Sequence, residues 1–172
     1  MTTTDTLRNQ PTTAELRELR FEIEEFNATY AQVLDEGDLY DWPKFFTDDG
    51  FYRITGRENA DEGLPIGLIY CDGMGMLIDR TRAIVKTTMH APRYLRHFNS
   101  NVQVLGVSAD GEIESRSNYL VVETLMEDKT RIFQAGRYDD VFIRTDDGDL
   151  KLKKRDCVYD SLIIPNALVY PV

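Results

Sequence analysis

Four long runs of residues with strand propensity make up most of the second half of the sequence, and they constrain the fold more than any other feature. They are rich in β-branched and aromatic residues and are separated only by short turn sequences such as Asp110-Gly111. Connections this short can join only antiparallel neighbours. We therefore expect a meander of long antiparallel strands at residues 94–107, 112–126, 130–144 and 150–159.

The first part of the sequence predicts helices. Thr12 followed by Glu15 matches the capping box, in which each side chain accepts a hydrogen bond from an otherwise unpaired backbone N–H. Apolar residues then recur at spacings of three and four as far as Gly37, which predicts an amphipathic helix over this stretch. Asp38 can cap a second, short helix that tolerates Pro43 in or near its first turn.

The middle of the sequence gives weaker signals. Residues 51–55 are aromatic and β-branched and predict a first strand, and residues 56–63 read as an acidic loop. Apolar residues at near-helical spacing predict a third helix over 72–85, with Asp72 as its cap.

Helices followed by a long meander predict an α+β domain whose antiparallel-rich sheet curves around the N-terminal helix. Gly106 and Gly136 are the expected bulge or bend positions in this sheet. The arrangement resembles the cystatin-like cone shared by nuclear transport factor two, ketosteroid isomerase and scytalone dehydratase. We expect one domain at residues 12–172, preceded by a disordered polar tail at residues 1–11.

Charge and composition exclude several functions. A formal net charge of -10 opposes close approach to a phosphate backbone, so nucleic-acid binding is not expected. The sequence contains no apolar stretch long enough for a membrane span, and its N-terminus lacks the apolar run of a secretory signal. We therefore expect a cytoplasmic protein without a membrane contact.

The sequence has too few candidate ligands for a redox metal centre. A Rieske cluster needs C-x-H and C-x-x-H pairs, and a mononuclear non-haem iron needs two His and a carboxylate. The only imidazoles are His90 and His97, and their separation of seven residues does not direct both at one ion in a strand or a helix. Cys71 and Cys157 are expected to be buried, reduced thiols. No metal site is predicted in this chain.

Acid–base chemistry inside the cone is an alternative that these residues leave open. Tyr30, Asp49, Tyr52, Asp72, His90 and His97 could supply the groups that a dehydratase or isomerase uses. Their spacing does not select any of them, and the numerous aromatic residues could equally fill the cone as core. A small-molecule binding module with the same cavity is a further alternative.

The C-terminal segment, residues 162–172, is almost entirely apolar and is interrupted by two prolines. Leaving it in water would be costly, so we expect it to be buried. It can lie along the sheet of its own chain or dock on another subunit, and the sequence favours neither.

Five sequence strings carry a family resemblance: LDEGDLYDWPKFFTDDGFYRIT, GLPIGLIYCDGMGMLIDR, HAPRYLRHFNSNV, GRYDDVF and KKRDCVYDSLIIPNALVYP. Together they resemble the small, or beta, subunit of Rieske-type aromatic-ring-hydroxylating dioxygenases, in particular those of salicylate, anthranilate and terephthalate oxygenases. The resemblance implies a non-catalytic subunit of a multi-component enzyme that hydroxylates an aromatic acid with O₂ and electrons from NAD(P)H.

The resemblance also implies partners and cofactors. Three small subunits would contact one another and three large, or alpha, subunits, and the large subunits would hold the Rieske 2Fe-2S cluster and the mononuclear non-haem iron. A reductase, and in some systems a ferredoxin, would supply the electrons. No catalytic, cofactor-binding or metal-binding residue is therefore assigned here. The predicted interface residues, chosen because bulky and partly polar side chains anchor interfaces, are Trp42, Tyr94, Arg96, His97 and Tyr170.

Overall fold

The computed structural model describes residues 11–87, 91–161, 163 and 168–172. The predicted N-terminal tail, apart from Pro11, and His90 lie outside the described residues. The helices are α1 (Thr13–Glu36), the 3₁₀ helix η1 (Leu39–Phe45), α2 (Arg57–Asp61) and α3 (Met74–Lys86). The strands are β1 (Phe46–Gly56), β2 (Ile69–Asp72), β3 (Arg93–Val107), β4 (Ile113–Leu125), β5 (Arg131–Arg144) and β6 (Leu150–Tyr159).

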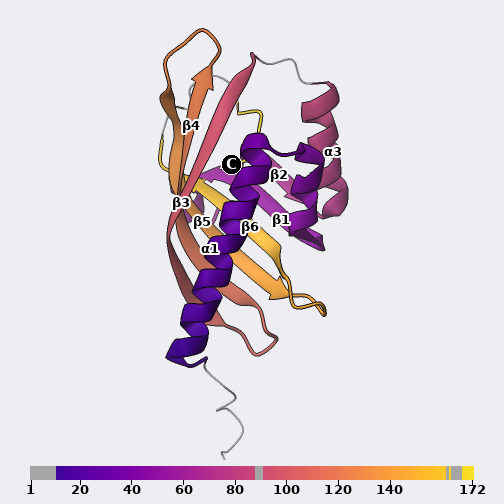
Figure 1. Ribbon diagram of the computed structural model, residues 1–172, viewed down its shortest axis with the longest axis vertical. Coiled ribbons are helices and arrows are strands. Elements are labelled where there is room, and N and C mark those ends of the chain that lie inside the picture. The colour runs from indigo at the N-terminus through magenta and orange to yellow at the C-terminus, as the bar shows by residue number, and fades with distance from the viewer. Residues whose placement is uncertain (1–10, 88–90, 162, 164–167) are drawn as a thin grey trace, which may run out of the picture.

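The strands form one six-stranded sheet in the order β2-β1-β6-β5-β4-β3. The predicted meander is confirmed, because β3, β4, β5 and β6 pair as consecutive antiparallel neighbours. Two features were not predicted: β1 lies parallel to β6, and β2 extends the sheet beyond β1. The sheet curls strongly along its length (Figure 1).

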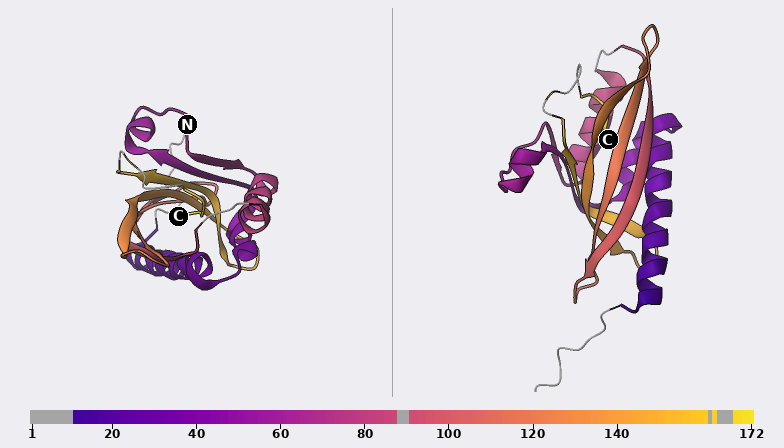
Figure 2. Two further views of the ribbon diagram at one scale, coloured as in Figure 1. Left: turned by 90° about the horizontal axis from the view of Figure 1, so that it is seen from above. Right: turned by 90° about the vertical axis from the view of Figure 1, so that its left-hand side faces the viewer.

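Helix α1 lies across the open side of the curled sheet and packs against β3, so that helix and sheet together enclose the interior (Figure 2). The capping box at Thr12 and Glu15 is confirmed, as is the end of the helix at Gly37. One face of α1 is buried through residues at helical spacing, among them Leu19, Ile23 and Tyr30.

Three local predictions need correction. Residues 57–61, which read as part of a loop, form the short helix α2. The second helix is confirmed but is 3₁₀ in type. The third helix begins after Gly73, whose φ of 81° favours glycine, and Asp72 is the last residue of β2 instead of a helix cap.

Polar groups on α1 form hydrogen bonds with the edge strand β3. Asp35 Oδ2 accepts a hydrogen bond from the backbone N–H of His97 at 3.0 Å, and Asp35 Oδ1 lies 2.6 Å from His97 Nδ1. Two turns earlier in the helix, the main-chain oxygen of Asn27 accepts a hydrogen bond from Asn99 Nδ2 at 3.2 Å. These contacts fix the helix to the edge strand and close the cone.

A fully buried arginine links the helix to the far side of the cone. The guanidinium of Arg155 on β6 donates two hydrogen bonds to Asp140 on β5, at 2.9 and 2.8 Å, and one to Asn27 Oδ1 on α1, at 2.6 Å. Its central carbon lies 4.3 Å from the ring centre of Tyr30 and 4.2 Å from that of Tyr138. The aromatic faces and the carboxylate together compensate for the lost hydration of the cation.

Removing the carboxylate should be costly, because it leaves the guanidinium buried without a counter-ion. We expect Asp140→Ala to lower the free energy of unfolding by about 3–5 kcal/mol in urea titrations. Asp139→Ala is the matched control: the neighbouring aspartate pairs with the partly exposed Arg116 and Arg137. Its loss should cost about 1 kcal/mol or less. Equal decreases in the free energy of unfolding for the two variants would show that Asp140 does not stabilise the buried guanidinium.

The two glycines predicted to bend the sheet have different roles. Gly106 lies at an irregularity in the pairing of β3 with β4, and the space around its Cβ position is open. Gly136 lies in regular pairing, but a Cβ there would sit 2.1 Å from the backbone oxygen of Val158. Position 136 therefore requires glycine because β6 passes too close for a side chain, and it does not form a bulge.

A pair of alanine substitutions tests this difference. Gly136→Ala must displace backbone, so we expect a loss of more than about 2 kcal/mol in the free energy of unfolding. Gly106→Ala should change it by about 0.5 kcal/mol at most. Thermal or urea unfolding of both variants measures the contrast, and a tolerated Gly136→Ala would show that β6 does not pass this close.

Candidate functional site: the rim of the cone and its outer face

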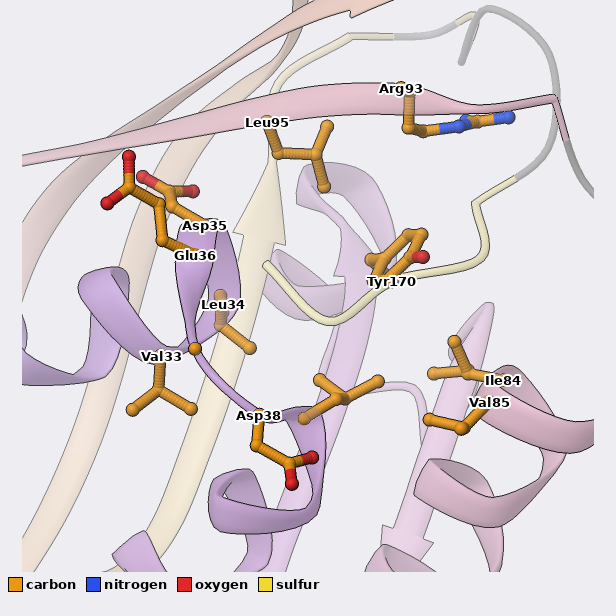
Figure 3. Close-up of a pocket in the computed structure, with 12 residues that line it drawn as sticks. Val33, Leu34, Asp35, Glu36, Asp38, Ile84, Val85, Arg93, Leu95 and Tyr170 are labelled. Carbon is orange, nitrogen blue, oxygen red and sulfur yellow. The ribbon is translucent and has the colours of Figure 1, made fainter.

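Three of the predicted interface residues lie on or near one rim of the cone, where the end of α1, the start of β3 and the C-terminal segment meet. A pocket of about 480 Å³ opens there, lined in part by Asp38, Arg93 and the half-buried Tyr170. Figure 3 shows Tyr170 between β3 and Ile84 of α3. The pocket is lined by both charged and apolar residues. A partner's side chain that has a polar and an apolar part would therefore fit it.

Tyr94 and Arg96 are exposed on the outer face of β3. Tyr94 is 62% exposed, and Arg96 Nη2 lies 2.7 Å from Glu36 Oε1 at the end of α1. An ion pair this exposed contributes about 1 kcal/mol or less to folding. Both side chains are thus available to a partner at little cost to the fold.

Trp42 and His97 do not lie on this surface. Trp42 is fully buried, and its Nε1 donates a hydrogen bond to Tyr30 Oη at 2.9 Å. The imidazole of His97 is also buried and contacts Asp35. We correct the predicted interface accordingly: η1 turns the indole into the core, the alternation of β3 turns the imidazole inward, and neither side chain has exposed surface for a partner.

The outer face of the sheet carries an apolar patch that was not predicted from the sequence. Two cross-strand rows form it: Phe98 of β3 opposite Leu120 of β4, and Val122 of β4 opposite Ile132 of β5. Phe98 and Ile132 are exposed, and the other two side chains are half-buried. We call these four residues the outer apolar patch. The available signal was that these four outward positions are apolar, where a solvated face should be polar.

The acid–base candidates that the structure describes are not assembled into a site. Asp49 and Asp72 are exposed on the surface, whereas Tyr30 and Tyr52 are fully buried. His97 contacts Asp35 and not the two tyrosines. His90 lies outside the described residues; among the other candidates only Tyr30 and Tyr52 come together, and they do so around the C-terminal segment.

The C-terminal segment Leu168–Val172 fills the interior. Figure 2 shows the C-terminus inside the ring made by the curled sheet and α1. Val172 is 1% exposed, and its N–H donates to Tyr52 Oη at 2.9 Å. The sequence left open whether this segment packs in its own chain or docks on another subunit. Residues 168–172 pack within their own chain. Residues 162 and 164–167 of the segment lie outside the described residues.

The residues present do not fit a Rieske cluster or a mononuclear iron. Cys71 and Cys157 are free and buried, as predicted, but they lie on strands at opposite sides of β1. Across residues 11–87, 91–161, 163 and 168–172, no group of three or more His, Cys, Asp or Glu side chains could hold a metal ion. Among the same residues, no helix is both long and apolar enough to cross a membrane.

Burial raises the pKa of the interior thiol and phenols. The pKa values of Cys157, Tyr30 and Tyr52 all rise because burial disfavours their charged forms. These groups therefore stay protonated at neutral pH and act as hydrogen-bond donors.

The raised pKa values predict a loss of stability in alkali. The unfolded chain releases the thiol proton above about pH 8.5 and the phenol protons above about pH 10, whereas the folded chain retains them. The unfolded state then binds fewer protons, so the free energy of unfolding must fall as the pH rises. Urea titrations at pH 7 to 10 measure the slope, and Cys157→Ala should make it shallower. An unchanged slope in that variant would contradict the assignment to the thiol.

The fold and the site define a filled α+β cone with a charged rim and an apolar outer face. The profile of the family described as "Ring hydroxylating beta subunit" matches residues 29–166. The chain belongs to this family.

Individual relatives agree with this assignment. The chain is 36% identical to the anthranilate 1,2-dioxygenase small subunit of Burkholderia cepacia, with 88% of this chain and 93% of the relative covered. It is 33% identical to a beta subunit of the terephthalate 1,2-dioxygenase terminal oxygenase component of Comamonas, with 88% and 97% covered. A crystal structure described as the beta subunit of an aromatic-ring-hydroxylating dioxygenase from Novosphingobium aromaticivorans superposes with a TM-score of 0.81 at 37% identity, covering 91% and 98%.

More distant solved structures confirm the cone fold. A protein assigned as a scytalone dehydratase from Novosphingobium aromaticivorans has a TM-score of 0.67 at 21% identity, covering 90% of this chain and 92% of that one. At this identity the likeness concerns the fold alone.

Proposed function

We propose that this chain is the small, non-catalytic subunit of an oxygenase that hydroxylates an aromatic acid with O₂ and electrons from NAD(P)H. The observation that carries the proposal is the family match over residues 29–166, together with relatives named for anthranilate and terephthalate, which are both aromatic acids. The cone supports a structural role because its interior is occupied by its own residues, among them Arg155 and Val172.

The proposal includes the partners and the location of the chemistry. A large oxygenase subunit would hold the Rieske cluster and the mononuclear iron, three large and three small subunits would form the assembly, and a reductase or ferredoxin would deliver electrons in the cytoplasm. Residues 12–172 would act as one domain, with residues 1–11 as a tail. The sequence has no C-x-H or C-x-x-H pair, and this supports a companion polypeptide as the metal-binding subunit.

The subunit contacts in this proposal use the rim and the outer apolar patch. Tyr94 and Arg96 are exposed beside Phe98 on the same strand, so the polar rim is continuous with an apolar surface. A desolvated apolar centre with a polar margin is the usual composition of a stable interface. Tyr170, which lines the pocket at the rim, would also contact the partner subunit.

Assembly can be tested with a charged substitution in the patch. Phe98→Asp should abolish or strongly reduce co-purification with the large subunit, because it buries an unpaired carboxylate in the contact. Leu105→Asp is the control. Leu105 lies on the same strand, further towards its end, and is 55% exposed, whereas Phe98 is 57% exposed. This substitution should leave co-purification unchanged, and circular dichroism should show both variants folded.

Two results would count against the proposal. Normal co-purification of Phe98→Asp would remove the outer apolar patch from the interface. Failure of the wild-type chain to co-purify with, or support aromatic hydroxylation by, a large subunit would contradict the proposed function as a whole.

A further inference from the structure

A polar pocket lies where α1, β3 and β4 meet, away from the rim and from the outer apolar patch. Its volume is about 450 Å³. Two arginines, three carboxamides and one buried valine line it: Arg20, Asn101, Val102, Gln103, Arg116 and Asn118. We call it the arginine–amide pocket. Among the described residues no acidic side chain lines it, although the formal net charge of the chain is -10.

A bulge in β3 shapes this pocket. One extra residue of β3 is inserted in its pairing with β4 between Ser100 and Gln103. Asn101 lies in the bulge with a φ of 56°, and among the described residues it is the one non-glycine residue with a positive φ. Asparagine tolerates this conformation better than most residues. The bulge turns Val102 into the core and leaves the side chains of both Asn101 and Gln103 exposed.

Both arginines are oriented through their Nε atoms. Arg20 Nε donates to Glu24 Oε1 at 2.9 Å, and Arg116 Nε donates to Asp139 Oδ1 at 2.6 Å. Within the described part of the chain, neither guanidinium donates a hydrogen bond from Nη1 or Nη2. These two nitrogens make the fork that binds a carboxylate through two parallel hydrogen bonds. Each arginine therefore has an unused carboxylate-binding fork.

The three carboxamides are unused as well. Asn101, Gln103 and Asn118 are exposed, and their side chains form no hydrogen bond with any other described residue. Together with the two guanidiniums they offer many more N–H donors than oxygen acceptors. A ligand that matches this pocket must therefore be rich in acceptor oxygens.

We propose that the arginine–amide pocket binds a small aliphatic dicarboxylate, with one carboxylate on Arg20, the other on Arg116 and the body of the ligand across the bulge. Two carboxylates are needed because α1 and β4 lie on different sides of β3, so the forks approach the pocket from two directions. A monocarboxylate or a single phosphate can occupy only one fork. The proposal does not rest on the oxygenase role, because this chain alone supplies every residue of the pocket.

Nuclear magnetic resonance titrations of the full chain can test this proposal with matched ligands. Adipate and hexanoate have the same number of carbon atoms and differ by one carboxylate. Adipate should shift the side-chain N–H₂ signals of Asn101, Gln103 and Asn118 saturably, and it should bind at least about fivefold more tightly than hexanoate. Inorganic phosphate should bind no more tightly than hexanoate. Added NaCl should weaken the binding of adipate.

Removing one fork should abolish the preference for two carboxylates. In Arg116→Gln the affinity for adipate should fall about fivefold, whereas that for hexanoate, which can still use Arg20, should change little. Arg57→Gln is the matched control, because Arg57 is similarly exposed and pairs with Asp160 outside the pocket. It lowers the charge of the chain by the same amount and should leave both affinities unchanged.

Asn101→Gly separates the carboxamide from the backbone that carries it. Glycine accepts a φ of 56° without strain, so the bulge and the stability of the fold should be retained. Loss of this donor should weaken the binding of adipate about threefold.

Three results would overturn the proposal. The first is the absence of a saturable shift up to the solubility limit of adipate. The second is binding of hexanoate or phosphate as tight as that of adipate. The third is an equal loss of affinity in Arg57→Gln and Arg116→Gln, which would show that binding follows net charge alone. If a variant is shown by circular dichroism to be unfolded, the wild-type comparison of adipate with hexanoate decides.

Discussion

The structure depends on a cation held inside the cone. Arg155 joins β6 to Asp140 on β5 and to Asn27 on α1, so one side chain connects the wall of the cone to the helix that closes it. A buried charge is tolerated only when its counter-ion and hydrogen-bond partners are in place. The pair therefore fixes the position of α1 relative to the sheet as well as the curvature that brings β5 and β6 around it. The edge contacts of Asp35 with His97 complete the same closure near the rim.

This closure decides which surfaces are available for function. The interior is occupied by Arg155, the buried tyrosines and the C-terminal segment, and Cys157 and Tyr52 there are fully buried. What the chain offers to other molecules is its outer face, where apolar rows from β3, β4 and β5 lie beside charged residues of the rim. A filled core with an apolar patch on its outer face is suited to a subunit that organises an assembly.

Local sequence signals predicted much of the fold. The capping box at Thr12 and the turns between the last four strands depend on neighbouring residues only, and both were predicted correctly. The parallel pairing of β1 with β6 joins strands that are far apart in the chain, and no local pattern specifies it. The burial of Trp42 was not predicted for the same reason. It depends on the packing of Phe46 and Tyr52 against the indole, which no local pattern specifies.

The proposed function has this subunit organise its oligomer and leaves the redox chemistry to a companion polypeptide. Iron analysis and oxygen-dependent turnover of an aromatic acid, measured on the separated chain and on its complex with the large subunit, test it most directly. The account predicts a colourless, iron-free and inactive separated chain, with iron and activity in the complex. Stoichiometric iron in the separated chain, or hydroxylation by it unaided, would contradict the account.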